Sequence, residues 1–177
     1  GEIQHGHMEQ VGYDTYCKLL DEVVKEMKGI QVEEEIDVQL DLDVSSYIPD
    51  EFIEDSNQKI EIYQEIALCK NEDEIKDITD SIIDRYGNMP KEIEKLLDIA
   101  RIRNACRAKN IIKVAQKSDK VIFYFDEKTF DFSVVDKLLK KYGMRIKFSP
   151  AKNPYVTYKL KNINDILKEI KEFLQDV

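Results

Sequence analysis

The sequence predicts an α+β fold, with a helical N-terminal half that holds one β-strand and a second half of the order ββα-ββα. Apolar residues recur at helical spacing in three consecutive segments between residues 56 and 109. Four short segments with the composition of strands follow residue 110, and each pair of them precedes a helical segment. This order predicts a small antiparallel sheet with helices packed on one face.

The start of the chain is predicted to hold one helix and one strand. Apolar residues at helical spacing over residues 13–28 predict a helix, which Gly29 ends. Residues 36–44 alternate strictly between five apolar and four polar side chains, so we expect a half-buried strand there. Its solvated face carries Asp37, Gln39, Asp41 and Asp43.

Three helices are predicted next, over residues 56–70, 72–86 and 90–109. Asn71 is a good N-cap for the second of them, and Gly87 is a good residue to end it. Each helix has one apolar face that we expect to be buried. These faces consist of Ile60, Tyr63, Ile66 and Ala67, then of Ile75, Ile78, Ile82 and Tyr86, and then of Ile93, Leu96, Leu97 and Ala100.

The last third of the chain is predicted to contain four strands and two helices. Residues 121–125 are apolar throughout, which is typical of a central strand. The helix over residues 133–142 is expected to bury Val134, Val135, Leu138 and Leu139. The remaining segments are strands over 111–116, 120–126, 145–149 and 155–161, and a closing helix over 163–174.

Length and composition fit a chain of 177 residues that forms one domain, or one domain with an attached segment of a neighbour. Hydrophobic residues make up 42% and charged residues 36%, enough for a core beneath a charged surface. Cys17, Cys69 and Cys106 lack the spacing of a metal clamp or redox motif, so we expect reduced, mostly buried thiols. With no apolar run of membrane length and no signal peptide at the start, we expect a cytoplasmic location.

The charge is divided unevenly along the chain. The formal net charge is −9, but residues 1–89 carry 24 acidic and 7 basic side chains, whereas residues 90–177 carry 12 acidic and 20 basic ones. This polarity argues against simple DNA coating by the first half and leaves DNA binding open for the second half.

The sequence shows no arrangement typical of a catalytic centre. It has no glycine-rich loop before a helix, no Walker signature and no cysteine pairs, so we expect no catalytic residue, cofactor site or metal ligand in this chain. One alternative is a metal site at His5 and His7, with Glu2 and Glu9 as neighbours; an exposed polar segment is the simpler interpretation. The other is a magnesium site among the acidic residues of 33–55, which include Glu33, Glu34, Glu35 and the alternate carboxylates of Asp41 and Asp43. A solvated strand face explains Asp37, Asp41 and Asp43 without a metal.

The helix over residues 72–86 carries its aspartates on one side. Asp73, Asp77, Asp80 and Asp84 form a stripe about 60° wide, opposite the apolar face. Like charges four residues apart repel, and the helix dipole disfavours an anion near the carboxyl end, as at Asp84. A stripe that costs folding stability is a candidate docking surface for a basic partner. The alternative is an ordinary solvated face.

A basic cluster follows on the next helix and beyond. A groove for nucleic acid would place aromatic residues among these charges, and none lies between Tyr86 and Phe123. Pairing with the acidic half is the simpler interpretation, with nucleic-acid binding as the alternative function. The cluster consists of Arg101, Arg103, Arg107, Lys109, Lys113 and Lys117.

Four stretches together resemble the end of the transcription-repair coupling factor family, known as Mfd. They are residues 4–17, residues 47–53, residues 83–87 with Pro90, and residues 96–103. The resemblance covers about residues 1–115 with their spacing, and beyond that the order of elements only. It implies a carboxy-terminal regulatory domain over residues 29–177.

The resemblance also implies that residues 1–28 are the tail of a translocase motor and its connecting helix. Gln4 and Gly6 match the end of a translocation motif shared with the RecG helicase, in which the glutamine helps to couple ATP hydrolysis to DNA movement. The parent would be an ATP-driven translocase, with ATP and magnesium in its motor and not in this chain. Its implied partners are RNA polymerase, UvrA and double-stranded DNA, with no membrane.

In that family the terminal domain is thought to fold back on the UvrA-binding amino-terminal module and hide it. Acidic residues three apart on the helix before Arg85 are implicated, and they face arginines. Asp84 matches one of them and Ser81 stands at the other, where Asp77 and Asp80 could supply the charge. The expected partner-binding residues are therefore Asp73, Asp77, Asp80, Ser81, Asp84 and Arg85.

Overall fold

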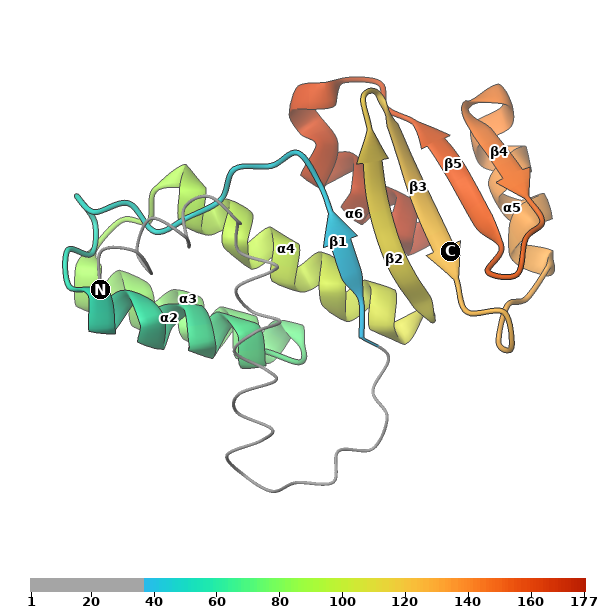
Figure 1. Ribbon diagram of the computed structural model, residues 1–177. Helices are drawn as coiled ribbons and strands as arrows, with labels where there is room; N and C mark the ends of the chain where they lie inside the picture. The colour runs from blue at the N-terminus through green and yellow to red at the C-terminus, as the bar shows by residue number, and fades with distance from the viewer. Residues whose placement is uncertain (1–36) are drawn as a thin grey trace. The chain divides into compact units, whose positions relative to one another are not determined.

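The computed structural model describes residues 37–177 (Figure 1). The predicted α+β class and the ββα-ββα order of the second half are confirmed. The helix predicted over residues 13–28 lies outside the described residues. In order, the elements are β1 (Gln39–Asp41), α2 (Ser56–Leu68), α3 (Glu72–Tyr86), α4 (Lys91–Ala108), β2 (Ile111–Lys117), β3 (Lys120–Phe125), α5 (Ser133–Tyr142), β4 (Ile146–Ser149), β5 (Tyr155–Lys159) and α6 (Ile166–Asp176), with short 3₁₀ turns at Gly143–Arg145 and Ile163–Asp165.

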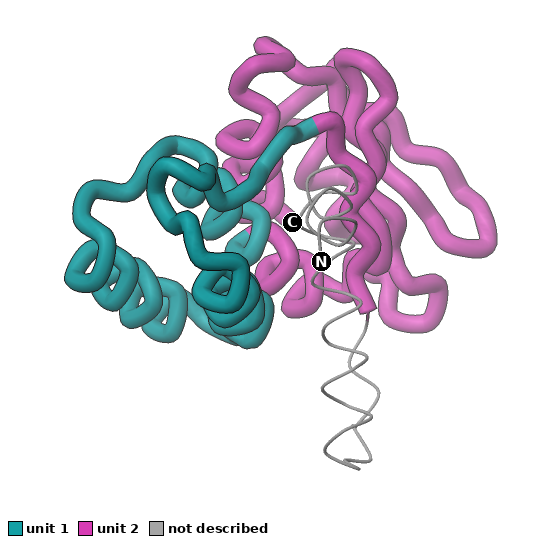
Figure 2. Tube along the Cα trace, turned by 60° about the vertical axis from the view of Figure 1, so that its left-hand side comes forward, with its two compact units in different colours: residues 1–33, 44–101 teal, residues 34–43, 102–177 magenta. Residues whose placement is uncertain are grey.

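The described chain divides into two compact units (Figure 2). Unit 1 holds residues 44–101, and unit 2 holds residues 37–43 together with residues 102–177. The division falls within α4. The domain boundary predicted between residues 28 and 29 lies outside the described residues and stays a prediction.

Unit 1 is built from α2, α3 and the first part of α4. Nearly every predicted core position of these helices is buried. The exceptions are Ile60 and Tyr86, which are half-buried. On α2 the buried face holds Tyr63, Ile66 and Ala67 as predicted and also includes Lys59 and Ile62, whereas Ile60 lies at its edge.

The loop before α2 is tied to that helix by one buried and one partly buried polar contact. Lys59 is only 2% exposed, and its ammonium group pairs with the Asp50 carboxylate. The Ile48 backbone N–H donates a hydrogen bond to the Tyr63 hydroxyl at 2.8 Å. Because a buried charge is costly unless it is paired, the contact between Lys59 and Asp50 holds the loop in place.

Unit 2 contains a five-stranded sheet in the order β1-β2-β3-β5-β4. The four strands after residue 110 pair antiparallel, as predicted. β1 pairs in parallel with β2 at the edge, so the sheet is mixed and has one strand more than the predicted antiparallel one. Within residues 37–44, the described part of the alternating segment, three residues form ladder pairs, and Val38 and Leu40 are buried as expected.

The core of unit 2 lies between one face of the sheet and its helices. α5 and α6 lie on the same face, behind the strands in the view of Figure 1. Phe123 of the central strand stacks on Phe173 of α6 with ring centroids 4.2 Å apart, and Tyr158 contacts both Phe173 and Tyr142. On α5 only Leu138 is fully buried, whereas Leu139 is 42% exposed, so its predicted burial was wrong.

Candidate docking surface on helix α3

The ends of α3 are fixed by local hydrogen bonds. The Asn71 side chain accepts from the Glu74 backbone N–H at 2.9 Å, and the Glu74 carboxylate accepts in turn from the Lys70 backbone N–H. Gly87 ends the helix with φ of 88°, a backbone conformation that favours glycine. The acids of the first turn complement the helix dipole. This explains Asp73 but not the aspartates further along the helix.

The predicted aspartate stripe faces solvent along the whole of α3. Asp73, Asp77, Asp80 and Asp84 are exposed, while Ile75 and Ile82 on the opposite side are fully buried. Across residues 37–177 none of the four carboxylates has a hydrogen-bond or ion-pair partner. The stripe therefore does not hold the described part of the chain together.

The cations beside the stripe do not neutralise it. Arg85 Nη2 donates to the Tyr86 hydroxyl at 3.1 Å, and its guanidinium lies over the Tyr86 ring, 5.1 Å from the centroid. Tyr86 in turn donates to Gln58 of α2. Arg85 is thus drawn toward α2, and among the described residues neither it nor Lys76 forms an ion pair with the stripe.

An open groove of about 450 Å³ runs between α2 and α3, beside the stripe. Asp77 and Ser81 line it from the predicted surface, and Ser81 is half-buried there. The residues that α2 contributes could not be predicted from the sequence, because only the packing of the two helices brings them to α3. The lining residues are Glu65, Leu68, Cys69, Glu74, Asp77, Ile78 and Ser81.

The Cys69 thiol reports the negative potential of this groove. Its pKa is raised to about 11, first by burial and then by the carboxylates of Glu74, Glu65 and Asp77. The thiol donates to the Glu65 backbone carbonyl at 3.2 Å. An ammonium or guanidinium group is the chemistry that would relieve such a concentration of anions.

The structure divides the predicted basic cluster. Arg101 donates to Glu72, which confirms part of the expected pairing with the acidic half, and also to Asp98 of its own helix. Arg103 is buried. Lys109 donates to the terminal Val177 at 2.6 Å. Lys113 and Lys117 lie instead on the sheet of unit 2.

The candidate metal-site residues lie partly outside and partly inside the described part of the chain. Gln4, Gly6 and the histidines lie outside the described residues. Asp37, Asp41 and Asp43 are exposed as expected, and Asp41 pairs with Lys113 at 3.6 Å. Within residues 37–177 no group of three potential ligands could hold a metal ion. Cys69 and Cys106 are buried and form no disulfide in the described part of the chain.

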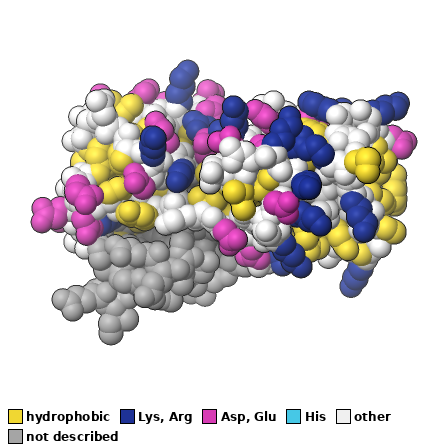
Figure 3. Space-filling view, turned by 90° about the horizontal axis from the view of Figure 1, so that it is seen from above, with side chains coloured by type: hydrophobic (Ala, Val, Ile, Leu, Met, Phe, Trp, Pro, Cys, Tyr) yellow, Lys and Arg dark blue, Asp and Glu magenta, His cyan; other side chains and the backbone are white. Residues whose placement is uncertain are grey.

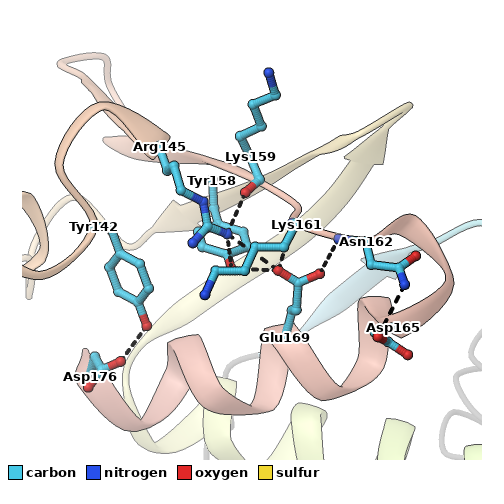
Figure 4. Close-up of polar contacts among 9 residues, drawn as sticks. All are labelled: Tyr142, Arg145, Tyr158, Lys159, Lys161, Asn162, Asp165, Glu169 and Asp176. Carbon is cyan, nitrogen blue, oxygen red and sulfur yellow. Dashed lines mark hydrogen bonds and ion pairs between the residues drawn. The ribbon is translucent and has the colours of Figure 1, made fainter.

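A second polar cluster, around Glu169 in unit 2, has a structural role (Figure 4). The Glu169 carboxylate accepts from the backbone N–H groups of Lys161 and Asn162 at 2.8 and 3.0 Å. It also accepts from the Tyr158 hydroxyl and from Arg145. Because its oxygens are saturated by groups of the same unit, this cluster anchors α6 and offers no free ligand position.

None of the helices among the described residues is both long and apolar enough to span a membrane.

Comparison with known proteins agrees with the resemblance found in the sequence. The transcription-repair-coupling factor of Staphylococcus aureus (strain USA300) is 32% identical over 176 residues, which cover 97% of this chain and 15% of the relative. That of Bacillus subtilis (strain 168) is 31% identical over 150 residues, which cover 82% of this chain and 13% of the relative. The chain thus spans about a seventh of the length of these curated relatives.

The fold has a solved counterpart, described as the crystal structure of the C-terminal domain of transcription-repair coupling factor. The TM-score is 0.71 at 23% identity, and the match covers 79% of this chain and 91% of the other. A family model described as the TRCF domain matches residues 42–133, which include α2, α3, α4 and the groove. Because this match spans more than half of the sequence, the chain belongs to the TRCF domain family.

Proposed function

We propose that this chain is the non-catalytic, carboxy-terminal regulatory domain of an ATP-dependent DNA translocase that couples transcription to nucleotide-excision repair. In this role the acidic face of α3 docks on the UvrA-binding module at the other end of the parent protein and masks it. The observation that supports the proposal is an exposed aspartate stripe, without hydrogen-bond or ion-pair partners among residues 37–177, beside a groove lined by three carboxylates. RNA polymerase, UvrA and double-stranded DNA would be partners of the parent, whose motor would hold ATP and magnesium.

The groove suits an arginine side chain of the partner. Leu68, which is 47% exposed, and Ile78 offer apolar surface to the arginine stem. Glu65 and Asp77 can accept hydrogen bonds from the guanidinium group, whose planar fork matches carboxylates. A lysine would form fewer of these contacts, so the proposed partner surface is rich in arginine.

The same surface predicts a weak and reversible contact. Exposed ion pairs contribute about 0–1 kcal/mol each and are screened by salt. Several such pairs in one chain are sufficient for an intramolecular contact, because a tether supplies a high effective concentration. When DNA and polymerase stabilise an open form of the parent, a contact of this strength opens by a population shift.

Asp84 and Ser81 differ in what they can contribute to the proposed docking contact. Asp84 is exposed on the last turn of α3, whereas Ser81 lies half-buried in the groove and carries no charge. The charge near Ser81 comes from Asp77 and Glu74, one to two turns earlier. We therefore propose that the docking surface is centred near Asp77 and Asp80. An acidic pair at positions 81 and 84 would centre it closer to the carboxyl end of α3.

The test is binding of the 177-residue chain to the separately produced UvrA-binding module of the same protein, measured by calorimetry. The double variant Asp80→Lys/Asp84→Lys should weaken binding at least 10-fold, and salt should weaken the wild-type contact. A matched control, Asp136→Lys/Glu127→Lys, makes the same charge change at exposed positions of unit 2. If the α3 variant binds as tightly as wild type, α3 is not the docking surface. If the control loses as much affinity as the α3 variant, net charge and not this surface explains the effect.

A further inference from the structure

The face of the unit 2 sheet opposite α5 and α6 is unusually basic. Phe123 and Tyr158 point to the helices, so their neighbours in the strands project to the other face. The ladder registers place five lysines and one carboxylate, Asp41, on that open face. The five are Lys113, Lys117, Lys120, Lys147 and Lys159.

Three of these lysines stand directly opposite one another across three strands. Lys117 of β2 pairs in register with Lys120 of β3, which pairs with Lys159 of β5. All three are exposed, and among the described residues none of the three ammonium groups has an ion-pair partner. Like charges directly opposite one another destabilise a sheet, so folding of unit 2 does not explain this lysine row.

Two tyrosines lie further along the same face. Tyr124 of β3 and Tyr155 of β5 are paired in register, with ring centroids 5.3 Å apart, and both residues are half-buried. Lys113 lies over the Tyr124 ring, 5.6 Å from the centroid. Tyr124 lies four positions along β3 from Lys120 of the lysine row, a distance of about 13 Å in an extended strand. The open face thus combines flat aromatic rings with a line of positive charge.

We propose that this open face binds single-stranded nucleic acid. Unpaired bases would stack on Tyr124 and Tyr155, and the phosphates would lie along the lysine row, which is the combination that single strands require. The charge of the unit agrees: the described residues of unit 2 hold 17 basic and 12 acidic side chains, whereas unit 1 holds 7 and 15. Figure 3 shows lysine and arginine side chains gathered over the unit 2 part of the molecule.

The tyrosine pair favours a single strand over other anionic partners, because only a single strand offers unpaired bases for stacking. A duplex keeps its bases stacked inside and would use only the lysines. An acidic polypeptide would likewise gain from the charge but has no bases to stack. The proposal is independent of α3, which lies in unit 1.

The experiment is a fluorescence-anisotropy titration of a labelled twelve-nucleotide oligothymidylate with the 177-residue chain. For three phosphate contacts, binding should weaken about 10- to 20-fold between 50 and 200 mM salt. Lys120→Glu/Lys159→Glu should weaken it at least 10-fold. Tyr124→Ala and Tyr155→Ala should each weaken it about 5-fold or more, as expected for one lost stacking contact, while Tyr124→Phe and Tyr155→Phe should bind as wild type does.

The control for the lysine variant is Lys140→Glu/Lys168→Glu, which makes the same charge change at exposed positions of α5 and α6. Near-wild-type binding by this control supports the open face, and an equal loss overturns it. The proposal is also overturned by absence of binding at 50 mM salt. Equal binding of a twelve-base-pair duplex with no effect of the tyrosine variants, or equal competition by polyglutamate, would likewise overturn it, because either result shows recognition of charge alone.

Discussion

The Tyr158 hydroxyl donates a hydrogen bond to the Glu169 carboxylate at 2.8 Å, and this contact joins the buried face of β5 to α6. Glu169 is only 7% exposed. Burial alone would raise the pKa of its carboxyl, but the backbone N–H groups of Lys161 and Asn162, the Tyr158 hydroxyl and Arg145 together lower the pKa below its usual value. The position of α6 therefore depends on one ionised, fully hydrogen-bonded side chain.

Replacing Glu169 by alanine should destabilise the protein by about 2 kcal/mol, because several buried donors lose their acceptor. The free energy of unfolding from urea denaturation, followed by circular dichroism, measures this loss. Glu172→Ala is the matched control, since Glu172 is exposed on the same helix and its loss should change stability by no more than about 0.5 kcal/mol. Similar values for the two variants would contradict the role given to Glu169.

Acid should remove this contribution selectively. The pKa values of Glu169 and Asp176 are both lowered in the folded state; for Asp176, burial opposes ionisation, but Lys141 and the Tyr142 hydroxyl outweigh it. A carboxyl with a lowered folded pKa stabilises the protein above its unfolded pKa of about 4, and this stabilisation is lost as the pH falls through the folded pKa. Wild type should therefore lose stability below about pH 4.5 more steeply than Glu169→Gln, as measured by urea unfolding between pH 7 and pH 3.

Ser81→Asp should strengthen docking of α3 on the UvrA-binding module. The substitution adds a carboxylate inside the groove that Ser81 lines, where an arginine of the partner is proposed to bind. One added exposed pair corresponds to about 2- to 5-fold tighter binding. Calorimetry with the separate module measures the change, and Ser45→Asp, at an exposed position of unit 1, controls for net charge. Unchanged or weaker binding by Ser81→Asp alone would place the contact elsewhere on α3.

Neutralising the groove should make Cys69 more reactive. Its pKa of about 11 is set first by burial and then by nearby carboxylates, so Glu65→Gln/Asp77→Asn should lower the pKa and raise the thiolate fraction. The rate of alkylation by iodoacetamide at pH 8.5, followed by mass spectrometry of the Cys69 peptide, should rise several-fold. Glu94→Gln, exposed on α4, should leave the rate unchanged. A rate that is the same in all three proteins would show that burial alone controls the thiol.

Local signals made the helices of unit 1 predictable. Asn71 and Gly87 fix the ends of α3 through hydrogen bonds within a few residues, and the aspartate stripe follows from helical periodicity alone. The groove could not be predicted, because Glu65 and Leu68 reach it only through the packing of α2 on α3. The same holds for Lys59, whose burial depends on Asp50 in the preceding loop.

Long-range pairing in unit 2 was less accessible to sequence reasoning. The parallel pairing of Leu40 with Val114 joins positions more than 70 residues apart, and no local pattern specifies it. The lysine row likewise requires the register between Lys120 and Lys159. The sequence criterion of aromatics interleaved with basic residues missed Tyr124 and Tyr155, since neighbouring strands and not neighbouring positions bring them to the lysines.

The parallel pairing of β1 with β2 makes the described part of unit 1, residues 44–101, an insertion between two segments of unit 2. The chain forms the edge strand, leaves to build residues 44–101, and returns to complete the sheet. β1 is therefore synthesised well before the strand that receives it, and closing the intervening loop adds to the contact order of folding. Residues 44–101 are joined to unit 2 through two covalent connections, so a force applied to them is carried to β1 at one end and through α4 to β2 at the other. A minimal unit 2 would require residues 43 and 102 to be joined directly, because truncation before residue 102 removes its edge strand.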